Sequence, residues 1–280
     1  MKSSANLKLL LSRLTAGVMM VSSFAYAIGG GSQGLSSAKA PVYVDSFEGQ
    51  AGDFWEPEMP HPSSYSGAPS TDYALSGEHS FRIELRKDDP DVQGSRRSEM
   101  ALSRNEKRNV EHTYSFATLL PDGGDEDYAL DPEGSEIIAQ WHNVPDPGEG
   151  WTTPPLALVT SNGRYWLGRC WDDAPITSSE QMVRKGNRAW HDLGSYLEDK
   201  GRFVRWSFHI KWGWKASQDP RLEVFKDGVK VLDLDGRPNT TNDKIGVYFK
   251  FGIYKWEWAE PEDPSILSRR VIYYDDISIQ

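Results

Sequence analysis

Two stretches of this sequence carry side chains that could move protons beside an anion. In residues 137–142, Gln140 and His142 fall on one face of a short apolar strand pattern. In residues 244–258, Tyr248, Lys250 and Tyr254 alternate with apolar residues. Histidine titrates near neutrality, so His142 suits the role of a general base. Tyr254 can donate a proton, and with Lys250 nearby it could serve as the base instead.

These side chains fit β-elimination on a uronic acid if the fold gathers them on one concave face. The C5 proton of a uronate is weakly acidic because the neighbouring carboxylate is anionic, so cations or amides must first neutralise that carboxylate. A base must then reach C5, and an acid must protonate the departing glycosidic oxygen. We expect the substrate-binding groups to include Arg82, Arg96, Gln140, Tyr248 and Trp256.

The strand expected within residues 244–258 must position the second group. At period two, its apolar side is Ile245, Val247, Phe249, Phe251 and Ile253, which we expect to be buried. The opposite side carries the tyrosines, the lysine, a tryptophan and two glycines, which is typical of the floor of a groove for a flat polar ligand. The alternative is a solvent-facing strand with cross-strand aromatic pairs.

The rest of the chain predicts an all-β fold. Short alternating strand patterns recur, and Asn162-Gly163 and Asp227-Gly228 are strong hairpin signals. Beyond residue 30 we find no capped helical pattern, and we expect residues 51–76 to form a long loop. The 17 Pro and 25 Gly suit many turns. We expect a β-sandwich or jelly roll of two antiparallel sheets with a concave substrate groove.

The N-terminus reads as an export signal. Positive charges precede a mostly apolar run, and a small-x-small site at residues 25–27 predicts cleavage after Ala27. The apolar run is too short and too interrupted for a membrane span. We therefore expect a signal peptide at residues 1–27, a flexible linker at 28–40 and one lyase-type domain at 41–280, secreted to the extracellular space or the periplasm.

Composition narrows the possible partners. A formal net charge of −10 argues against nucleic acid, which needs a dominant basic surface. An anionic polysaccharide stays possible if its site gathers a local cluster of cations.

Cys170 is the only cysteine, and its tryptophan-rich surroundings favour a buried structural thiol over a nucleophile. We expect a monomer that needs no cofactor for its chemistry.

The sequence resembles the heparin lyase I-like polysaccharide lyases, which include glucuronan lyases, over most of residues 43–279. The sharpest motifs are Gln140-Trp141-His142 and the segment 250–254, Lys-Phe-Gly-Ile-Tyr, followed by the terminal segment 273–279. The resemblance implies a β-jelly roll, with His142 as base, Tyr254 as acid and Lys250 close by. It also implies an arginine that assists with the carboxylate, for which Arg96 or Arg97 is the natural match. We take Arg97 as the catalytic one, and which of His142 and Tyr254 takes the proton stays open.

Two further inferences concern the substrate and a metal. The chain has no long Lys/Arg clusters of the kind that bind heavily sulfated polymers, which favours an unsulfated polyuronate such as glucuronan or alginate. Relatives of this fold often hold a structural calcium, and Asp275 and Asp276, with Glu48 as a weaker choice, are plausible oxygen ligands. The alternative for these two aspartates is an acidic strand end in water.

Two other classes of function stay open. A jelly-roll glycoside hydrolase would need two carboxylates facing each other across a groove, and Glu133 and Glu136 do not form that signature. A carbohydrate-binding module would explain the aromatic residues but not the adjacent His, Tyr, Lys and Arg. His142 could also simply cap a strand end, and Arg96-Arg97 could be a solvated turn.

Overall fold

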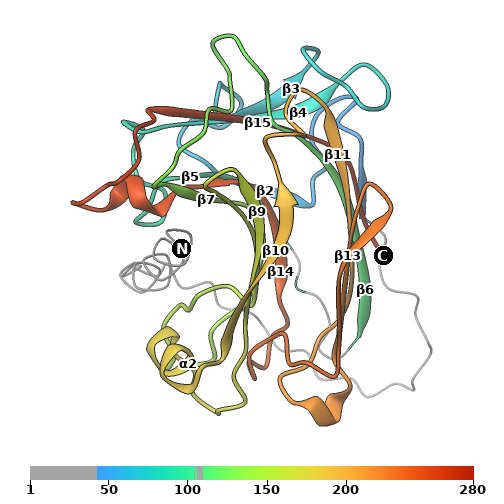
Figure 1. Ribbon diagram of the computed structural model, residues 1–280, viewed down its shortest axis with the longest axis vertical. Helices are drawn as coiled ribbons and strands as arrows, with labels where there is room; N and C mark the ends of the chain where they lie inside the picture. Colours follow the sequence, from blue (N-terminus) through green and yellow to red (C-terminus); the bar gives the residue numbers. More distant parts are fainter. Residues whose placement is uncertain (1–42, 104, 106–109) are drawn as a thin grey trace.

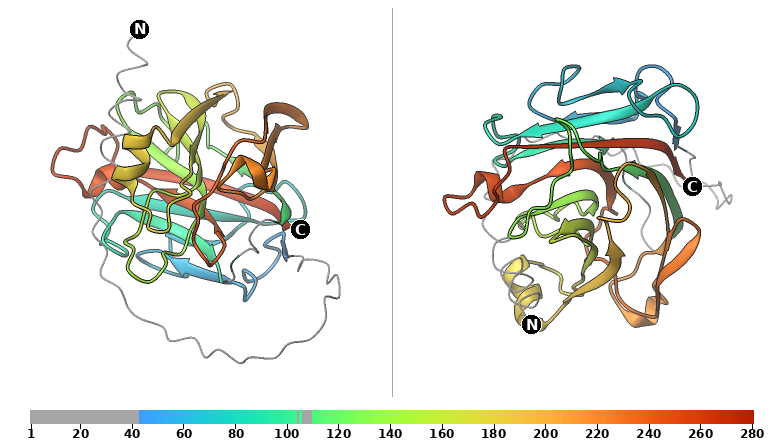
Figure 2. Two further views of the ribbon diagram at one scale, coloured as in Figure 1. Left: turned by 90° about the horizontal axis from the view of Figure 1, so that it is seen from below. Right: turned by 45° about the horizontal axis from the view of Figure 1, so that its top comes forward.

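The computed structural model describes residues 43–280 apart from 104 and 106–109. The expected signal peptide and linker lie outside these residues. The described chain folds into two antiparallel sheets that pack face to face (Figures 1 and 2). The elements are β1 (Tyr43–Asp45), β2 (Trp55–Glu58), β3 (Gly67–Ser70), β4 (Ser80–Arg86), β5 (Arg97–Leu102), β6 (Glu111–Leu119), β7 (Ser135–His142), β8 (Leu156–Ser161), β9 (Arg164–Cys170), α2 (Ser179–Lys185), β10 (Arg188–Ser195), β11 (Phe203–Lys211), η1 (Ala216–Gln218), β12 (Arg221–Lys226), β13 (Val229–Asp235), β14 (Tyr248–Tyr254), η2 (Trp256–Ala259) and β15 (Arg269–Ile279).

The two sheets interleave distant parts of the chain. The 8-stranded sheet has the order β13-β12-β11-β6-β15-β4-β3, with β1 added on β15. The 7-stranded sheet has the order β10-β9-β8-β7-β14-β5-β2. Strand β14 therefore lies between β7 and β5, although more than 100 residues separate it in sequence from each of these two strands. In Figure 1, β15, β4 and β3 run above β5 and β7.

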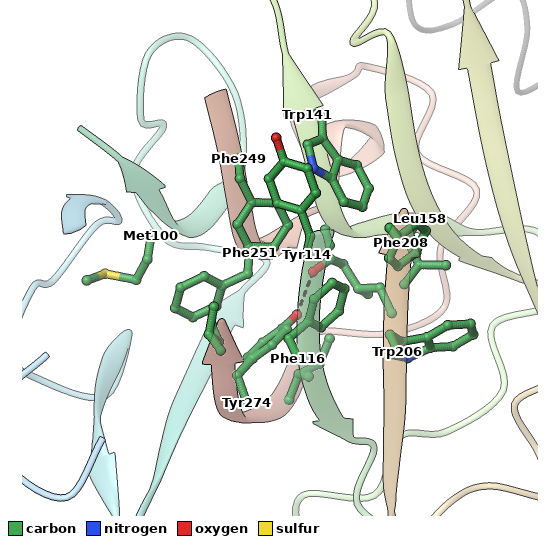
Figure 3. Packing of buried hydrophobic residues seen from close by; sticks show 14 of the residues in the cluster. Met100, Tyr114, Phe116, Trp141, Leu158, Trp206, Phe208, Phe249, Phe251 and Tyr274 are labelled. Carbon is green, nitrogen blue, oxygen red and sulfur yellow. Dashed lines mark hydrogen bonds between the residues drawn. The ribbon is translucent and has the colours of Figure 1, made fainter. Parts of the chain in front are cut away.

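The core lies between the sheets and is rich in aromatic side chains. Phe249 and Phe251 of β14 project into it beside Trp141 of β7, and Tyr274 of β15 meets them from the other sheet (Figure 3). The Trp141 and Phe208 ring centroids are 4.7 Å apart. The predicted burial of Val247, Phe249, Phe251 and Ile253 is confirmed. Ile245 is 48% exposed because the strand begins only at residue 248, so its predicted burial is wrong.

Both predicted hairpins are confirmed. Asn162 and Gly163 have φ of 46° and 79°, and Asp227 and Gly228 have φ of 50° and 78°. Positive φ at both central residues is what a two-residue turn of the right twist requires. These turns join β8 to β9 and β12 to β13.

Four strands and one helix were not foreseen. Strands β2 and β3 lie in the region expected to be a loop, and β5 and β10 carried no clear strand pattern. All six residues of β5 are buried, including Arg97 and Glu99, so its sequence lacks the alternation that marks a half-exposed strand. Helix α2 is short but properly capped, by the Ser178 side chain at its start and by Gly186 with φ 72° at its end. No helix in the described ranges is long and apolar enough to cross a membrane.

Candidate active site

The candidate site lies on the face of the seven-stranded sheet that points away from the core, which we call the site face. Strand β14 places Tyr248 opposite His142 and Lys250 opposite Gln140 on β7. On its other side, Tyr254 lies opposite Arg97 of β5. Side chains of a strand alternate between faces, so the residues buried in the core force their neighbours onto the site face.

Gly252 allows β14 to pass close to β5 at the point where these side chains are placed on the site face. Its φ is 135°, and a Cβ atom there would lie 2.3 Å from the Ser98 carbonyl oxygen. The register between β14 and β7 shifts between Phe251 and Tyr254, which marks a β-bulge. The Tyr274 hydroxyl lies beneath it, 2.7 Å from the carbonyl oxygen of Ile138 and 3.0 Å from that of Gly252. Only glycine fits this close approach of two strands.

A compact group of four charged residues forms the centre of the site face. The Lys250 Nζ atom is 2.5 Å from Glu58 Oε2 and 2.9 Å from Glu99 Oε2. The Arg97 Nη1 atom is 3.4 Å from Glu58 Oε2 and 3.7 Å from Glu99 Oε2. Gln140 adds a hydrogen bond from Nε2 to Glu99 Oε1, 2.5 Å long. We call Arg97, Lys250, Glu58 and Glu99 the charged quartet.

Pairing keeps Lys250, Arg97 and Glu58 charged despite their burial. Burial alone would lower the pKa of Lys250, but Glu99 and Glu58 raise it above its usual value. Burial would likewise lower the pKa of Arg97, which Glu99 raises. Burial would raise the pKa of Glu58, but the charge of Lys250 and then that of Arg97 bring it below the usual range. Two cations therefore face the charged carboxylate of Glu58.

Tyr254 lies directly beside the quartet. The Arg97 guanidinium carbon is 4.4 Å from the centroid of the Tyr254 ring, a cation–π contact. Tyr254 is half-buried, and its ring is 5.8 Å from that of Trp256 in η2. The predicted grouping of Arg97, Lys250 and Tyr254 is thus observed as a set of neighbours.

His142 is held in one tautomer. Its Nδ1 atom lies 2.9 Å from the backbone oxygen of Asn143. A carbonyl oxygen only accepts, so Nδ1 carries the proton and Nε2 of the neutral ring keeps a free lone pair. Burial, followed by the positive charges of Lys250 and Arg97, lowers the pKa of His142 to about 4. The imidazole is therefore neutral near pH 7 and can accept a proton at Nε2.

Tyr248 stands next to this histidine. The two ring centroids are 5.9 Å apart, and the Trp151 ring lies 5.3 Å from the His142 ring on another side. Burial raises the pKa of Tyr248 to about 12. Tyr248 is therefore a hydroxyl donor at neutral pH.

Aromatic side chains continue the site face toward β10. Trp256 is buried in a cluster with Tyr254, Trp166 and Trp190, whose apolar base is formed by Ile137, Ala157 and Val159. A cavity over the same strands has Trp190 in its lining. Trp256 is only 3% exposed, so within this cluster it is the half-buried rings of Tyr254, Trp166 and Trp190 that can present a face to a ligand.

Two of the predicted arginines lie elsewhere. Arg82 is on β4 of the eight-stranded sheet, where it bonds Glu84 and Glu126. Arg96 precedes β5 and turns away from its neighbour Arg97, bonding the Lys87 carbonyl oxygen and Asp91. Alternation in β4 correctly indicated an outward side chain, but it could not tell which sheet would hold that strand.

Two carboxylates of the site were missed. Glu99 follows Arg97 at a spacing of two, and charged residues at that spacing in a strand share a face, which is a signal that could have found it. Glu58 lies in the region expected to be a loop, so no pattern pointed to it.

The two aspartates considered as calcium ligands are engaged by the chain itself. The Asp275 carboxylate accepts hydrogen bonds from the backbone N–H groups of Leu75 at 2.8 Å, Ser76 at 3.3 Å and Asp276 at 2.7 Å. Asp276 accepts one from the Ser76 hydroxyl. Among the described residues, no three His, Cys, Asp or Glu side chains are placed to hold a metal ion. The aspartates thus do not form a ligand set with other such side chains, and calcium here stays a prediction.

Cys170 is buried at the end of β9. Burial raises the pKa of its thiol to about 11, so the thiolate is not formed near neutral pH. The prediction of a structural thiol is confirmed.

Comparison with known proteins identifies the family. The family model described as Polysaccharide lyase matches residues 47–278. The fold is similar to that of an endo-β-1,4-glucuronan lyase from the fungus Trichoderma reesei, with a TM-score of 0.61 and 20% identity over 81% of this chain and 94% of that one. It is also similar to alginate lyase A1-II', a member of polysaccharide lyase family 7, with a TM-score of 0.54 and 15% identity over 81% and 94%.

Another fold neighbour is the cellulose-induced protein Cip1, with a TM-score of 0.53 and 14% identity over 85% of this chain and 96% of that one. A comparison with curated proteins finds no match. The likeness to these solved structures supports the predicted jelly-roll sandwich. Because the family model spans most of the chain, this protein belongs to the polysaccharide lyase family.

Proposed function

We propose that this chain is a heparin lyase I-like enzyme that cleaves an unsulfated polyuronate, such as glucuronan or alginate, by β-elimination. The observation that carries the proposal is one cluster on the site face. A neutral histidine, a tyrosine and a lysine–arginine pair lie on three adjacent strands of a polysaccharide lyase chain. Each of the three tasks of the elimination then has a side chain of suitable chemistry.

The first task is to neutralise the uronate carboxylate. Arg97 and Lys250 supply positive charge, and the Gln140 amide can donate a hydrogen bond to an oxygen. Donors fixed in place beforehand stabilise the negative charge that develops on the carboxylate as the C5 proton leaves, because they need not reorganise during the step.

The second and third tasks are proton transfers. We assign the removal of the C5 proton to His142 Nε2, because the bond from Nδ1 to the Asn143 carbonyl oxygen leaves that atom unprotonated. Tyr254 then donates its hydroxyl proton to the departing glycosidic oxygen. The C4–O bond breaks as the C4–C5 double bond forms, and the products are an unsaturated uronate end and a new reducing end.

The balance of charge at the site favours an unsulfated substrate. The charged quartet sums to zero, and the chain as a whole is acidic, with a formal charge of −10. A heavily sulfated polymer carries several charges on each repeat and needs a strongly positive groove. The fold neighbours described as glucuronan lyase and alginate lyase point in the same direction. Secretion by the N-terminal signal would bring the enzyme to such extracellular polymers.

The test is to incubate the purified mature protein with glucuronan, alginate, polygalacturonate and heparin, and to follow the ultraviolet absorbance of the unsaturated product. We expect absorbance to rise with an unsulfated polyuronate and to be lost in Tyr254→Phe and His142→Ala. The matched control is His209→Ala, on β11 of the other sheet, which should keep full activity. Activity that persists in both site variants would contradict the assigned roles, and preference for heparin would contradict the substrate class.

A further inference from the structure

Glu58 is the last residue of β2, the edge strand of the seven-stranded sheet. It lies opposite Glu99 in the register between β2 and β5. A single oxygen, Oε2, contacts both cations of the site, at 2.5 Å from Lys250 Nζ and 3.4 Å from Arg97 Nη1. A carboxylate oxygen therefore already occupies the point between the two cations that the uronate carboxylate needs.

The two carboxylates of the charged quartet differ in how firmly they are held. Glu99 is 1% exposed, lies on a strand paired on both sides and accepts a hydrogen bond from Gln140. Glu58 is 14% exposed and ends an edge strand. When a third carboxylate enters, Glu58 is therefore the one that can turn outward to water, while Glu99 keeps its partners.

We propose that Glu58 stands in for the substrate carboxylate: it holds Lys250 and Arg97 in place in the free enzyme, and the incoming uronate displaces it. This inference rests on the proposed function of the site. Its consequence is that Glu58 weakens the binding of substrate, because each uronate must replace an existing charge-assisted contact rather than fill an unused one. Glu58 thus sets KM and takes no part in proton transfer. Its role is one of positioning and affinity.

The ionisation state of Glu58 agrees with this role. Its pKa lies below the usual range because Lys250 and Arg97 outweigh the effect of burial, so the competing group is charged near pH 7. A neutral group at the same place would compete far less, since it would leave one net positive charge on the remaining three residues of the charged quartet.

The experiment compares Glu58→Gln with Glu56→Gln on the polyuronate that the wild type cleaves. Glu56 lies two residues earlier on the same face of β2 but is exposed. Its substitution removes the same charge from the protein and controls for general repulsion of an anionic polymer. We expect Glu58→Gln to lower KM about tenfold with kcat changed less than about threefold, and Glu56→Gln to leave both nearly unchanged. Lys250 should stay in place in Glu58→Gln because it keeps Glu99.

Each outcome decides the question. An unchanged or raised KM in Glu58→Gln, with the wild type active, overturns the inference and leaves the proposed function standing. A wild type that cleaves no polymer overturns the proposed function, and calorimetry with glucuronate then tests the anion site alone. Tighter binding to Glu58→Gln than to wild type supports the stand-in, and equal binding overturns it. If Glu58→Gln does not fold, Glu58→Asp replaces it, with a smaller fall in KM expected because the charge remains but the reach shortens.

Discussion

Lys255 carries a positive charge that is completely enclosed by the protein. It follows Tyr254 directly and is 0% exposed. Its Nζ atom is 2.9 Å from Glu136 Oε2, 3.1 Å from Asp131 Oδ2 and 3.7 Å from Glu257 Oε2. We consider Lys255→Met, which keeps a long apolar stem and removes only the ammonium group.

The size of the effect follows from the burial of the carboxylates. Glu136 keeps its ion pair with Arg270, 2.8 Å away, so the lost compensation falls mainly on Asp131. Removing one partner of a buried ion pair costs about 3–5 kcal/mol, because a charge is left without compensation. In a domain of this size each kcal/mol moves the melting temperature by about 2–4 °C, so we expect a fall of roughly 6–20 °C. Lys255 is also the N-cap residue of η2, and its ammonium group lies 3.7 Å from Glu257 of that turn, so activity should fall as Tyr254 and Trp256 lose their fixed positions.

The assay is urea unfolding followed by circular dichroism, with a thermal melt alongside. The matched control is Lys244→Met, whose side chain is 75% exposed and 3.6 Å from Asp146. The control should change the free energy of unfolding by no more than about 0.5 kcal/mol. A loss below about 1 kcal/mol for Lys255→Met would refute the idea that its charge compensates the buried acids.

Three further predictions concern the site and its supports. The acidic limb of the pH profile of kcat/KM should fall near pH 4. Burial and the nearby cations lower the pKa of His142 to about 4, so the base is neutral above that value. A limb near pH 6.5, in a protein still folded by circular dichroism, would contradict the histidine assignment. Gly252→Ala should lose about 2–4 kcal/mol of stability and most activity, because its Cβ would lie 2.3 Å from the Ser98 carbonyl oxygen. The control Gly49→Ala, with open space around it, should lose neither stability nor activity. Equal melting temperatures of the two variants would be inconsistent with the strand contact. Burial raises the pKa of Glu257 from 4.5 to about 7, so between these pH values the folded state binds more protons than the unfolded state. The stability of the wild type should therefore fall by up to about 3 kcal/mol as pH rises through this window. Glu257→Gln should reduce that fall in pH-dependent urea unfolding, and an unchanged slope would count against the shifted pKa.

The alternation of apolar and polar residues in β14 allowed us to predict which of its side chains are buried and which share the opposite face. Phe249, Phe251 and Ile253 are buried, and Tyr248, Lys250 and Tyr254 share the opposite face. Such patterns depend only on residues within one strand and its turns, so they can be recognised in the sequence. The two hairpin turns could be predicted for the same reason. Ile245 shows the limit, because the pattern extends past the point where strand pairing begins.

Facts set by distant pairing could not be read from the sequence. Arg82 has the same alternating context as a site residue, but its strand joins the other sheet. Glu58 belongs to a four-residue strand without a pattern of its own, and only the pairing of β2 with β5 brings it to Lys250. Lys250 was expected to lie near Tyr254 and to be available to the substrate. Two carboxylates, each far from it in sequence, instead hold it.

The ratio of two products in one digest separates β-elimination from hydrolysis and from binding alone. Purified wild-type protein is incubated with glucuronan and with alginate, and unsaturated ends are counted by ultraviolet absorbance while reducing ends are counted chemically. β-Elimination predicts equal numbers of the two ends at every time point on a polymer that is cleaved. Reducing ends without absorbance would indicate hydrolysis, and binding without either product would indicate a carbohydrate-binding module; both results would contradict the mechanism assigned to His142 and Tyr254.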